Sequence, residues 1–76
     1  MERVGEVVRT AQGLAIARVG SGEQPPGIGA MVVDESLSEV GRVVDVFGPV
    51  DRPYVAVTPH DSVTLASMLD TKLYAR

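Results

Sequence analysis

The feature that most limits how this chain can fold is the distribution of its valines, which lie in short runs between turns. Runs such as RVGEVVRT, LAIARV and YVAV are separated by segments that contain glycine or proline. Valine is branched at Cβ and therefore suits a pleated strand better than a helix. Short strands with frequent turns predict an all-β fold, either a small barrel or a sandwich.

Apolar alternation within these runs places the expected strands. In LAIARV, Leu14, Ile16 and Arg18 share one face of a strand and the intervening residues share the other. Closing so short a sheet into a barrel would protect its edges from pairing with other chains. The expected strands are residues 3–10, 14–19, 31–33, 37–46, 54–57 and 71–75.

Two glycines and one helical segment complete this secondary-structure prediction. Gly5 lies within the first strand and marks a bulge or a close approach of another backbone, and Gly41 marks a bulge. Residues 62–70 carry apolar side chains three apart, but the segment is short, so at most one helical turn is expected. No internal repeat is expected.

The length and the charge of the chain narrow the possible functions. A chain of 76 residues predicts a single domain spanning 1–76 with a small core. It has no cysteine, so neither a disulfide nor a thiolate zinc site is possible. The formal charge is −3, with one lysine and six scattered arginines, which disfavours autonomous binding of RNA or DNA through phosphates. A local basic patch could still form in three dimensions.

The chain shows neither a signal peptide nor a membrane-spanning run. Its opening residues, MERVGEVV, lack the apolar core of a signal peptide, and nothing approaches about 20 consecutive apolar residues. A cytoplasmic protein with no membrane partner is therefore expected.

The glycine- and proline-rich segment 20–29, GSGEQPPGIG, has two interpretations. A phosphate-binding loop would need a helix directly after it, together with a Lys-Ser/Thr end or a βαβ context. Here a short valine run follows instead, so a surface connection is favoured. The adjacent carboxylates Asp34 and Glu35 are interpreted as a solvated turn and not as a metal pair.

No catalytic constellation is found in the sequence. His60 is the single histidine, which excludes a cluster of histidine metal ligands. The neighbours Asp61 and Ser62 do not make a triad, because triad residues meet in space and not as sequence neighbours. Asp45 is expected to point outward from a strand, and Asp51 is expected in a turn. We therefore predict no catalytic residues, no cofactor and no metal, and a protein that is not an enzyme.

The stretch GRVVDVFGPVDRPYVAV, residues 41–57, is more informative. Simple alternation puts Val44 and Val46 on one face of a strand and Val43 and Phe47 on the other, so both faces are largely apolar. A barrel strand needs only one buried face. The second apolar face must therefore meet something else, either the end of the barrel or a binding partner.

The prolines of this stretch favour an ordered surface. Pro49 and Pro53 preset φ and remove backbone donors, so the loop is ordered before a partner arrives. Phe47 and Tyr54 stand beside this stiff turn. Aromatic side chains on a preordered loop suit protein binding, because less entropy is lost on association. The residues alone leave both interpretations open.

The run VGRVVDVFGPVDRPYVAV resembles the signature of the Gar-type subunit of H/ACA ribonucleoproteins. In that signature a G-x-V-x-D-x-F-G-P-V hairpin leads into a P-Y-x-x-V strand. The opening R-x-G-x-V strand and the VVDESLSEVG segment also fit, so the resemblance covers most of the chain. The Gly-Arg-rich tails of eukaryotic members are absent from this sequence, which therefore looks like the archaeal core form. The signature includes Gly41 and Asp45 as well as the hairpin.

The resemblance implies a small six-stranded split β-barrel similar to those of translation proteins, reductases, isomerases and elongation factors. It implies an accessory subunit that binds the pseudouridine synthase catalytic subunit and positions its substrate loop. The synthase performs RNA-guided pseudouridylation of rRNA, a part of ribosome biogenesis and rRNA processing. Guide RNA would be reached only indirectly through the complex, with no DNA partner. The implied partner-binding residues are Phe47, Gly48, Pro49, Val50, Arg52, Pro53 and Tyr54.

Two alternatives remain open at this point. One is a small RNA-binding or translation-type barrel that contacts RNA directly. The other is an assembly chaperone of the same barrel family that occupies the synthase only transiently.

Overall fold

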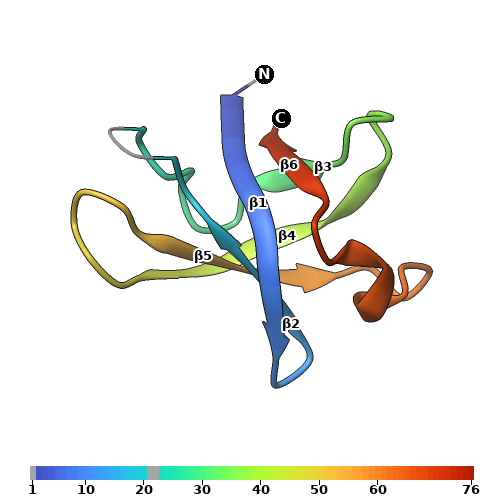
Figure 1. Ribbon diagram of the computed structural model, residues 1–76. Helices are drawn as coiled ribbons and strands as arrows, with labels where there is room; N and C mark the ends of the chain where they lie inside the picture. Colours follow the sequence, from blue (N-terminus) through green and yellow to red (C-terminus); the bar gives the residue numbers. More distant parts are fainter. Residues whose placement is uncertain (1, 21–22) are drawn as a thin grey trace.

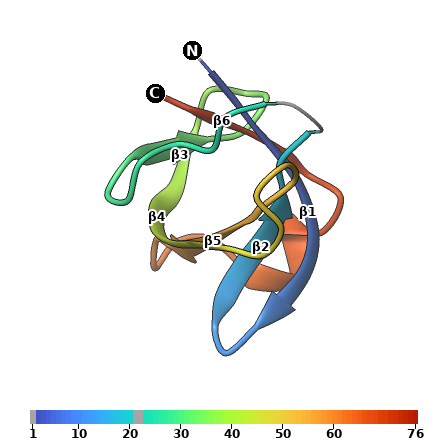
Figure 2. The ribbon, with the colours of Figure 1, turned by 90° about the vertical axis from the view of Figure 1, so that its left-hand side faces the viewer.

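Six strands form one antiparallel sheet that closes on itself in the order β1-β2-β5-β4-β3-β6 (Figure 1). The structure is a computed structural model that describes residues 2–20 and 23–76. Viewed after a quarter turn, the strands surround a common interior (Figure 2). The elements are β1 (Glu2–Ala11), β2 (Leu14–Arg18), β3 (Met31–Val33), β4 (Glu39–Phe47), β5 (Tyr54–Pro59), the 3₁₀ turn η1 (Leu65–Met68) and β6 (Lys72–Ala75).

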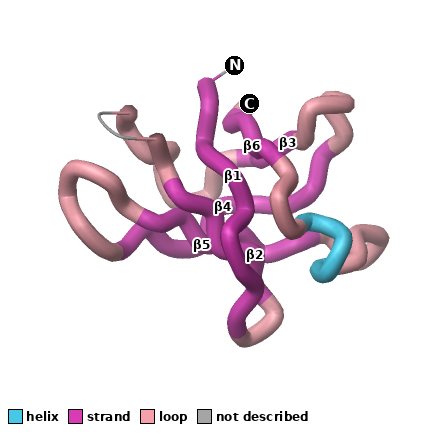
Figure 3. Tube along the Cα trace, viewed as in Figure 1, coloured by secondary structure: helices cyan, strands magenta, loops and turns pink. Residues whose placement is uncertain are grey.

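The predicted all-β class, the six strands and the single helical turn are confirmed (Figure 3). Two boundaries were wrong by two residues, and five others differ by one residue. Leu37 has φ +67° and lies in the turn before β4, where backbone bonds to the Asp34 side chain replace strand pairing. Thr58 and Pro59 extend β5, because they pair with Arg42 and Gly41. No helix in the described ranges is long and apolar enough to span a membrane.

The two longest strands, β1 and β4, each pair with two neighbours and are bent by bulges. The register of β1 shifts at Val4 against β6 and at Val8 against β2. The register of β4 shifts at Val40 against β3 and at Val44 against β5. A bulge adds one residue to one strand, which bends it and increases its twist. Four bulges on two strands thus turn a short sheet into a ring.

These shifts reveal an internal repeat, contrary to the expectation that there is none. The motif V-G-x-V-V occupies residues 4–8 in β1 and again 40–44 in β4. Both of its outer valines carry a bulge in each strand. Five residues are too few to stand out in a valine-rich sequence, and the repeat becomes clear only from strand pairing.

The pairing registers extend this repeat to the whole barrel. Val7 pairs with Ala17 in the first hairpin, as Val43 pairs with Val57 in the second. The ring order is also unchanged when β1 is exchanged with β4, β2 with β5 and β3 with β6. The fold therefore has an approximate two-fold relation between its halves. Equivalent positions in the two hairpins can be compared directly.

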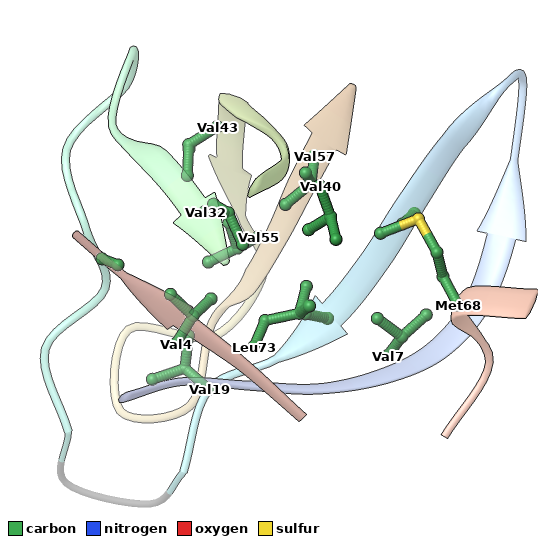
Figure 4. Close-up of a cluster of buried hydrophobic side chains, with 13 residues drawn as sticks. Val4, Val7, Val19, Val32, Val40, Val43, Val55, Val57, Met68 and Leu73 are labelled. Carbon is green, nitrogen blue, oxygen red and sulfur yellow. The ribbon is translucent and has the colours of Figure 1, made fainter. Parts of the chain in front are cut away.

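The core lies inside the ring and is built mainly from valine (Figure 4). All six strands contribute to it, and Met68 of η1 adds a longer side chain. Burial of such side chains contributes about 1.5–3 kcal/mol each relative to exposure. The core residues are Val4, Val7, Ala15, Ala17, Val19, Val32, Val40, Val43, Val55, Val57, Met68, Leu73 and Ala75.

Glycine is required where the bent strands approach a neighbouring backbone. A Cβ atom at Gly41 would overlap the carbonyl oxygen of Thr58, and one at Gly5 would overlap that of Arg18. Both glycines are buried. The prediction of a close approach at Gly5 is confirmed, and the bulge predicted at Gly41 lies at its neighbour Val40.

We expect Gly41→Ala to lower the free energy of unfolding by about 2–3 kcal/mol, because the new methyl group must displace rigid backbone. Gly27→Ala is the matched control, since Gly27 has no atom within 4 Å of an added Cβ. That control should be neutral or slightly stabilising. Urea unfolding followed by circular dichroism measures both variants. Equal unfolding midpoints for the two would contradict the close approach.

Candidate functional site

The bulge at Val44 decides which side chains of the β4–β5 hairpin face outward. Because Val44 is an extra residue, Val43 and Val46 both pack against the core. Val44 and Phe47 are instead exposed, by 41% and 38%. The predicted assignment of Val44 with Val46, and of Val43 with Phe47, is therefore wrong. The run VVDVF is apolar at all positions but Asp45, so the sequence does not show where a bulge lies, and one extra residue reverses every later orientation.

Phe47 and Tyr54 form a stacked pair on the outside of the barrel. They are cross-strand partners, with ring centroids 5.6 Å apart and an interplanar angle of 24°. Neither ring belongs to the core cluster. The interpretation that both rings fill the end of the barrel is thus not supported, and the pair is an outward-facing feature.

Gly48 permits the position of the Tyr54 ring. Its φ of +95° lies in the left-handed region, and an added Cβ would be 2.9 Å from Tyr54 Cδ2. A residue with a side chain would therefore be strained in its backbone and would also push against the ring. The glycine serves both the turn and the aromatic pair.

The loop between the two rings is fastened to the end of β2. The Pro53 carbonyl accepts a bond of 3.0 Å from the Val19 backbone N–H, and Arg52 Nε donates to the Val19 carbonyl at 3.4 Å. The Arg52 N–H also donates to the Pro49 carbonyl at 3.2 Å, closing a turn. Pro53 is buried, whereas Val50 is 99% exposed. The loop, the yellow segment in Figure 1, thus presents Val50 from an anchored base.

Two arginines from the first hairpin lie beside the Tyr54 ring. The guanidinium carbon of Arg9 is 5.5 Å from the ring centroid, and that of Arg18 is 5.3 Å away. Both distances are within the range of cation–π attraction, which is about 0.5–1 kcal/mol at exposed sites. Aromatic and cationic side chains from four strands therefore gather on one outer face.

Strand pairing explains this gathering. Glu6, Arg18, Tyr54 and Phe47 form a cross-strand row over β1, β2, β5 and β4. In the next cross-strand row, Arg9 lies at one end and Asp45 at the other, and buried Ile16 and Ala56 lie between them. We call the six side chains of Arg9, Arg18, Phe47, Val50, Arg52 and Tyr54 the aromatic–arginine face.

The two-fold relation shows that the barrel does not require this face. In the first hairpin, Ala11 pairs with Leu14 at the positions equivalent to Phe47 and Tyr54. That hairpin closes through a short turn at Gln12 and not through a long loop. The same scaffold position is thus filled by small or aliphatic residues in one half. The aromatic pair and the longer loop are additions that folding itself does not explain.

A concave region lies apart from this face, between the β3–β4 turn and η1, beside Ser38, Thr64 and Met68. Two of its five hydroxyl side chains, Ser67 and Thr71, bond to backbone carbonyls within the chain. Ser67 Oγ donates to the Thr64 carbonyl at 2.6 Å, and Thr71 Oγ1 donates to the Ser67 carbonyl at 3.4 Å.

The residues first considered for chemistry do not converge. The backbone of His60 donates to the Val40 carbonyl and accepts from the Val63 N–H, both at 2.9 Å. Asp45 points outward and accepts a bond of 2.9 Å from the Val46 N–H, while Asp51 is exposed in the hairpin loop. Within residues 2–20 and 23–76 no three His, Cys, Asp or Glu side chains gather as metal ligands.

The irregular segment 20–29 lies partly outside the described residues, because Ser21 and Gly22 are not among them. Its later part leads into β3, where Gly29 N–H donates to the Val43 carbonyl at 2.8 Å. A strand therefore follows where a phosphate loop would need a helix, which agrees with a surface connection. Asp34 accepts bonds from the backbone of Ser36 and Ser38, as expected for a turn.

Arg9 and Arg18 are the site residues that the sequence did not indicate. Alternation placed Arg18 on one face with Leu14 and Ile16, but it did not say which strand lies beside that face. Pairing of β2 with β5 brings Arg18 opposite Tyr54 across 36 residues of sequence. The bulge at Val8 then turns Arg9 to the same side. Only a predicted β2–β5 pairing could have revealed the cluster.

Residues 1–76 match the model of a family described as the Gar1/Naf1 RNA binding region. An uncharacterized protein of Methanocaldococcus jannaschii is 39% identical over 51 residues, which cover 67% of this chain. The match spans 58% of the length of that relative.

We expect Gly48→Ala to displace the Tyr54 ring and to lower stability by about 1–2 kcal/mol through its strained φ. Gly13→Ala is the matched control, because Gly13 also has a positive φ of +79° but no atom within 4 Å of an added Cβ. Proton NMR of the Phe47 and Tyr54 rings should change for the first variant alone. Unchanged ring shifts in Gly48→Ala would contradict the packing of Tyr54 on this glycine.

Proposed function

Because the chain belongs to the family described as the Gar1/Naf1 RNA binding region, we propose that it is an accessory subunit of an H/ACA ribonucleoprotein. In this role it binds the pseudouridine synthase catalytic subunit and promotes RNA-guided pseudouridylation of rRNA. The subunit itself is non-catalytic and works in the cytoplasm of an archaeal cell. The observation that carries the proposal is the outward-facing Phe47–Tyr54 pair on an anchored loop.

The physical properties of the hairpin suit a protein partner. Phe47 and the 99% exposed Val50 offer apolar area that water covers in the free chain. Interface energy is concentrated in a few buried aromatic and arginine anchors. The bonds from Val19 to Pro53 and from Arg52 to Val19 order the loop in advance. Less conformational entropy is then lost on binding. Within the predicted partner-binding set, buried Pro53 serves as support and not as a contact.

The proposed mechanism is a population shift. A bound barrel favours the synthase conformation in which the substrate loop is positioned for loading and release. The shift can be no larger than the difference in affinity for the two conformations. The subunit therefore needs no chemistry of its own, only a surface that prefers one conformation.

We expect the double variant Phe47→Ala, Tyr54→Ala to bind the synthase about 30-fold or more weakly, because aromatic anchors often contribute 2 kcal/mol or more. Leu14→Ala is the matched control, since Leu14 holds the position equivalent to Tyr54 in the other hairpin. Isothermal titration calorimetry measures the affinity, and circular dichroism checks that each variant folds. Unchanged affinity in a folded double variant would rule out this site.

Direct RNA binding is a second candidate function, favoured by the family description and by arginines beside exposed aromatic rings. Stacking of bases on such rings is a common mode of single-strand recognition. Under our first proposal, guide RNA is retained only when the synthase is present. Binding of guide RNA to the isolated chain, with an affinity that falls steeply as salt is added, would favour the second candidate.

A further inference from the structure

The arginines of the first hairpin extend the proposed docking site beyond the signature hairpin. We propose that Arg9 and Arg18 form a binding site for a carboxylate side chain of the partner protein that docks on the aromatic–arginine face. This inference rests on the proposed function, because it gives the chemistry of the partner at that same site. It adds a contact from β1 and β2 to a surface otherwise formed by β4 and β5.

The geometry concentrates positive charge at one place. Both guanidinium carbons lie within 5.5 Å of the centroid of one ring, that of Tyr54. Because both guanidinium groups lie beside the same ring, their positive charges repel each other, an effect that water and salt weaken. Arg52 adds a third guanidinium at the same end of β2, where its Nε donates to the Val19 carbonyl. An anion bound beside these groups relieves the repulsion.

Among the described residues, neither Arg9 nor Arg18 forms a salt bridge. The salt bridge found among residues 2–20 and 23–76 joins Arg76 to Glu39, elsewhere on the barrel. Glu6 is the cross-strand partner of Arg18 but forms no salt bridge with it. Arg18 Nε is also buried without a hydrogen-bond acceptor. That atom is out of reach of a docking protein, so a carboxylate would bind Arg18 through its terminal Nη groups, which are not among the buried unpaired atoms.

Comparison of the two hairpins separates this arrangement from the needs of the fold. The positions equivalent to Arg9 and Arg18 in the other half are Asp45 and Thr58. The barrel therefore accepts an acidic residue and a neutral one at these places. A pair of arginines is not required to pair β1 with β2.

The surroundings favour a carboxylate of a protein over an RNA strand. Glu6, Asp45 and Asp51 border the face, and the chain as a whole carries −3. A chain of phosphates would be repelled by these carboxylates, whereas a single Asp or Glu side chain can bind the arginines without approaching them. The exposed Phe47 and Val50 add apolar area that suits a protein surface. Arginine is well suited to bind a carboxylate through two parallel hydrogen bonds.

The test uses the full chain with Arg9→Gln, Arg18→Gln and the double variant, titrated against the synthase by calorimetry. Each single change should weaken binding about tenfold, because a charge-assisted bond is lost. Arg3→Gln is the matched control, as Arg3 lies in β1 next to β6 and away from Tyr54. It removes the same charge and should change affinity less than twofold. Thermal unfolding confirms that every variant is folded.

Two further measurements separate a carboxylate contact from general charge. Arg18→Lys keeps the charge but loses the paired hydrogen bonds, so it should recover only part of the affinity. Added salt should weaken wild-type binding more than binding of the double variant.

Wild-type affinity in the folded double variant would overturn the proposed carboxylate site and leave the proposed function standing. No synthase binding by the wild type would overturn both. Loss of guide-RNA binding in the double variant, with synthase binding unchanged, would assign the arginines to phosphate.

Discussion

Closure of six short strands into one ring is the constraint on which the rest of this structure depends. Each strand of the ring pairs with two neighbours, and the two longest strands, β1 and β4, bend at bulges to do so. Bending brings backbones so close at Gly5 and Gly41 that a side chain cannot fit. The valine core follows from the same closure, because it is the ring that encloses the inward faces.

The bulges also create the candidate site. An extra residue at Val44 turns Phe47 outward, where it stacks on Tyr54, and an extra residue at Val8 turns Arg9 to the same face. The aromatic–arginine face is thus a consequence of how the barrel closes. The two-fold relation between the halves makes this visible, since one half keeps Ala11 and Leu14 where the other carries the aromatic pair.

Much of the fold could be predicted because local patterns agree with it. Valine runs, glycine turns and the weak helical segment each indicate the element that is found. The hairpin residues Phe47 and Tyr54 could also be singled out, since aromatic side chains beside prolines are unusual in this sequence. The side of the sheet on which each ring lies could not be assigned, because one bulge reverses the inward–outward alternation of side chains and the sequence does not mark that bulge. The internal repeat was missed for a related reason. It is evident from the pairing registers, whereas few residues are identical between the two halves.

The sequence by itself determined the all-β class, the positions of the strands and the stiff hairpin, because these depend on residues that are neighbours in the chain. Only the tertiary structure decided the order of strands in the ring, the outward orientation of the Phe47–Tyr54 pair and the clustering of Arg9 and Arg18 beside Tyr54. Those arrangements depend on the pairing of β2 with β5 and on bulges in β1 and β4. Pairing between strands distant in sequence is set by closure of the whole sheet, which no local pattern encodes.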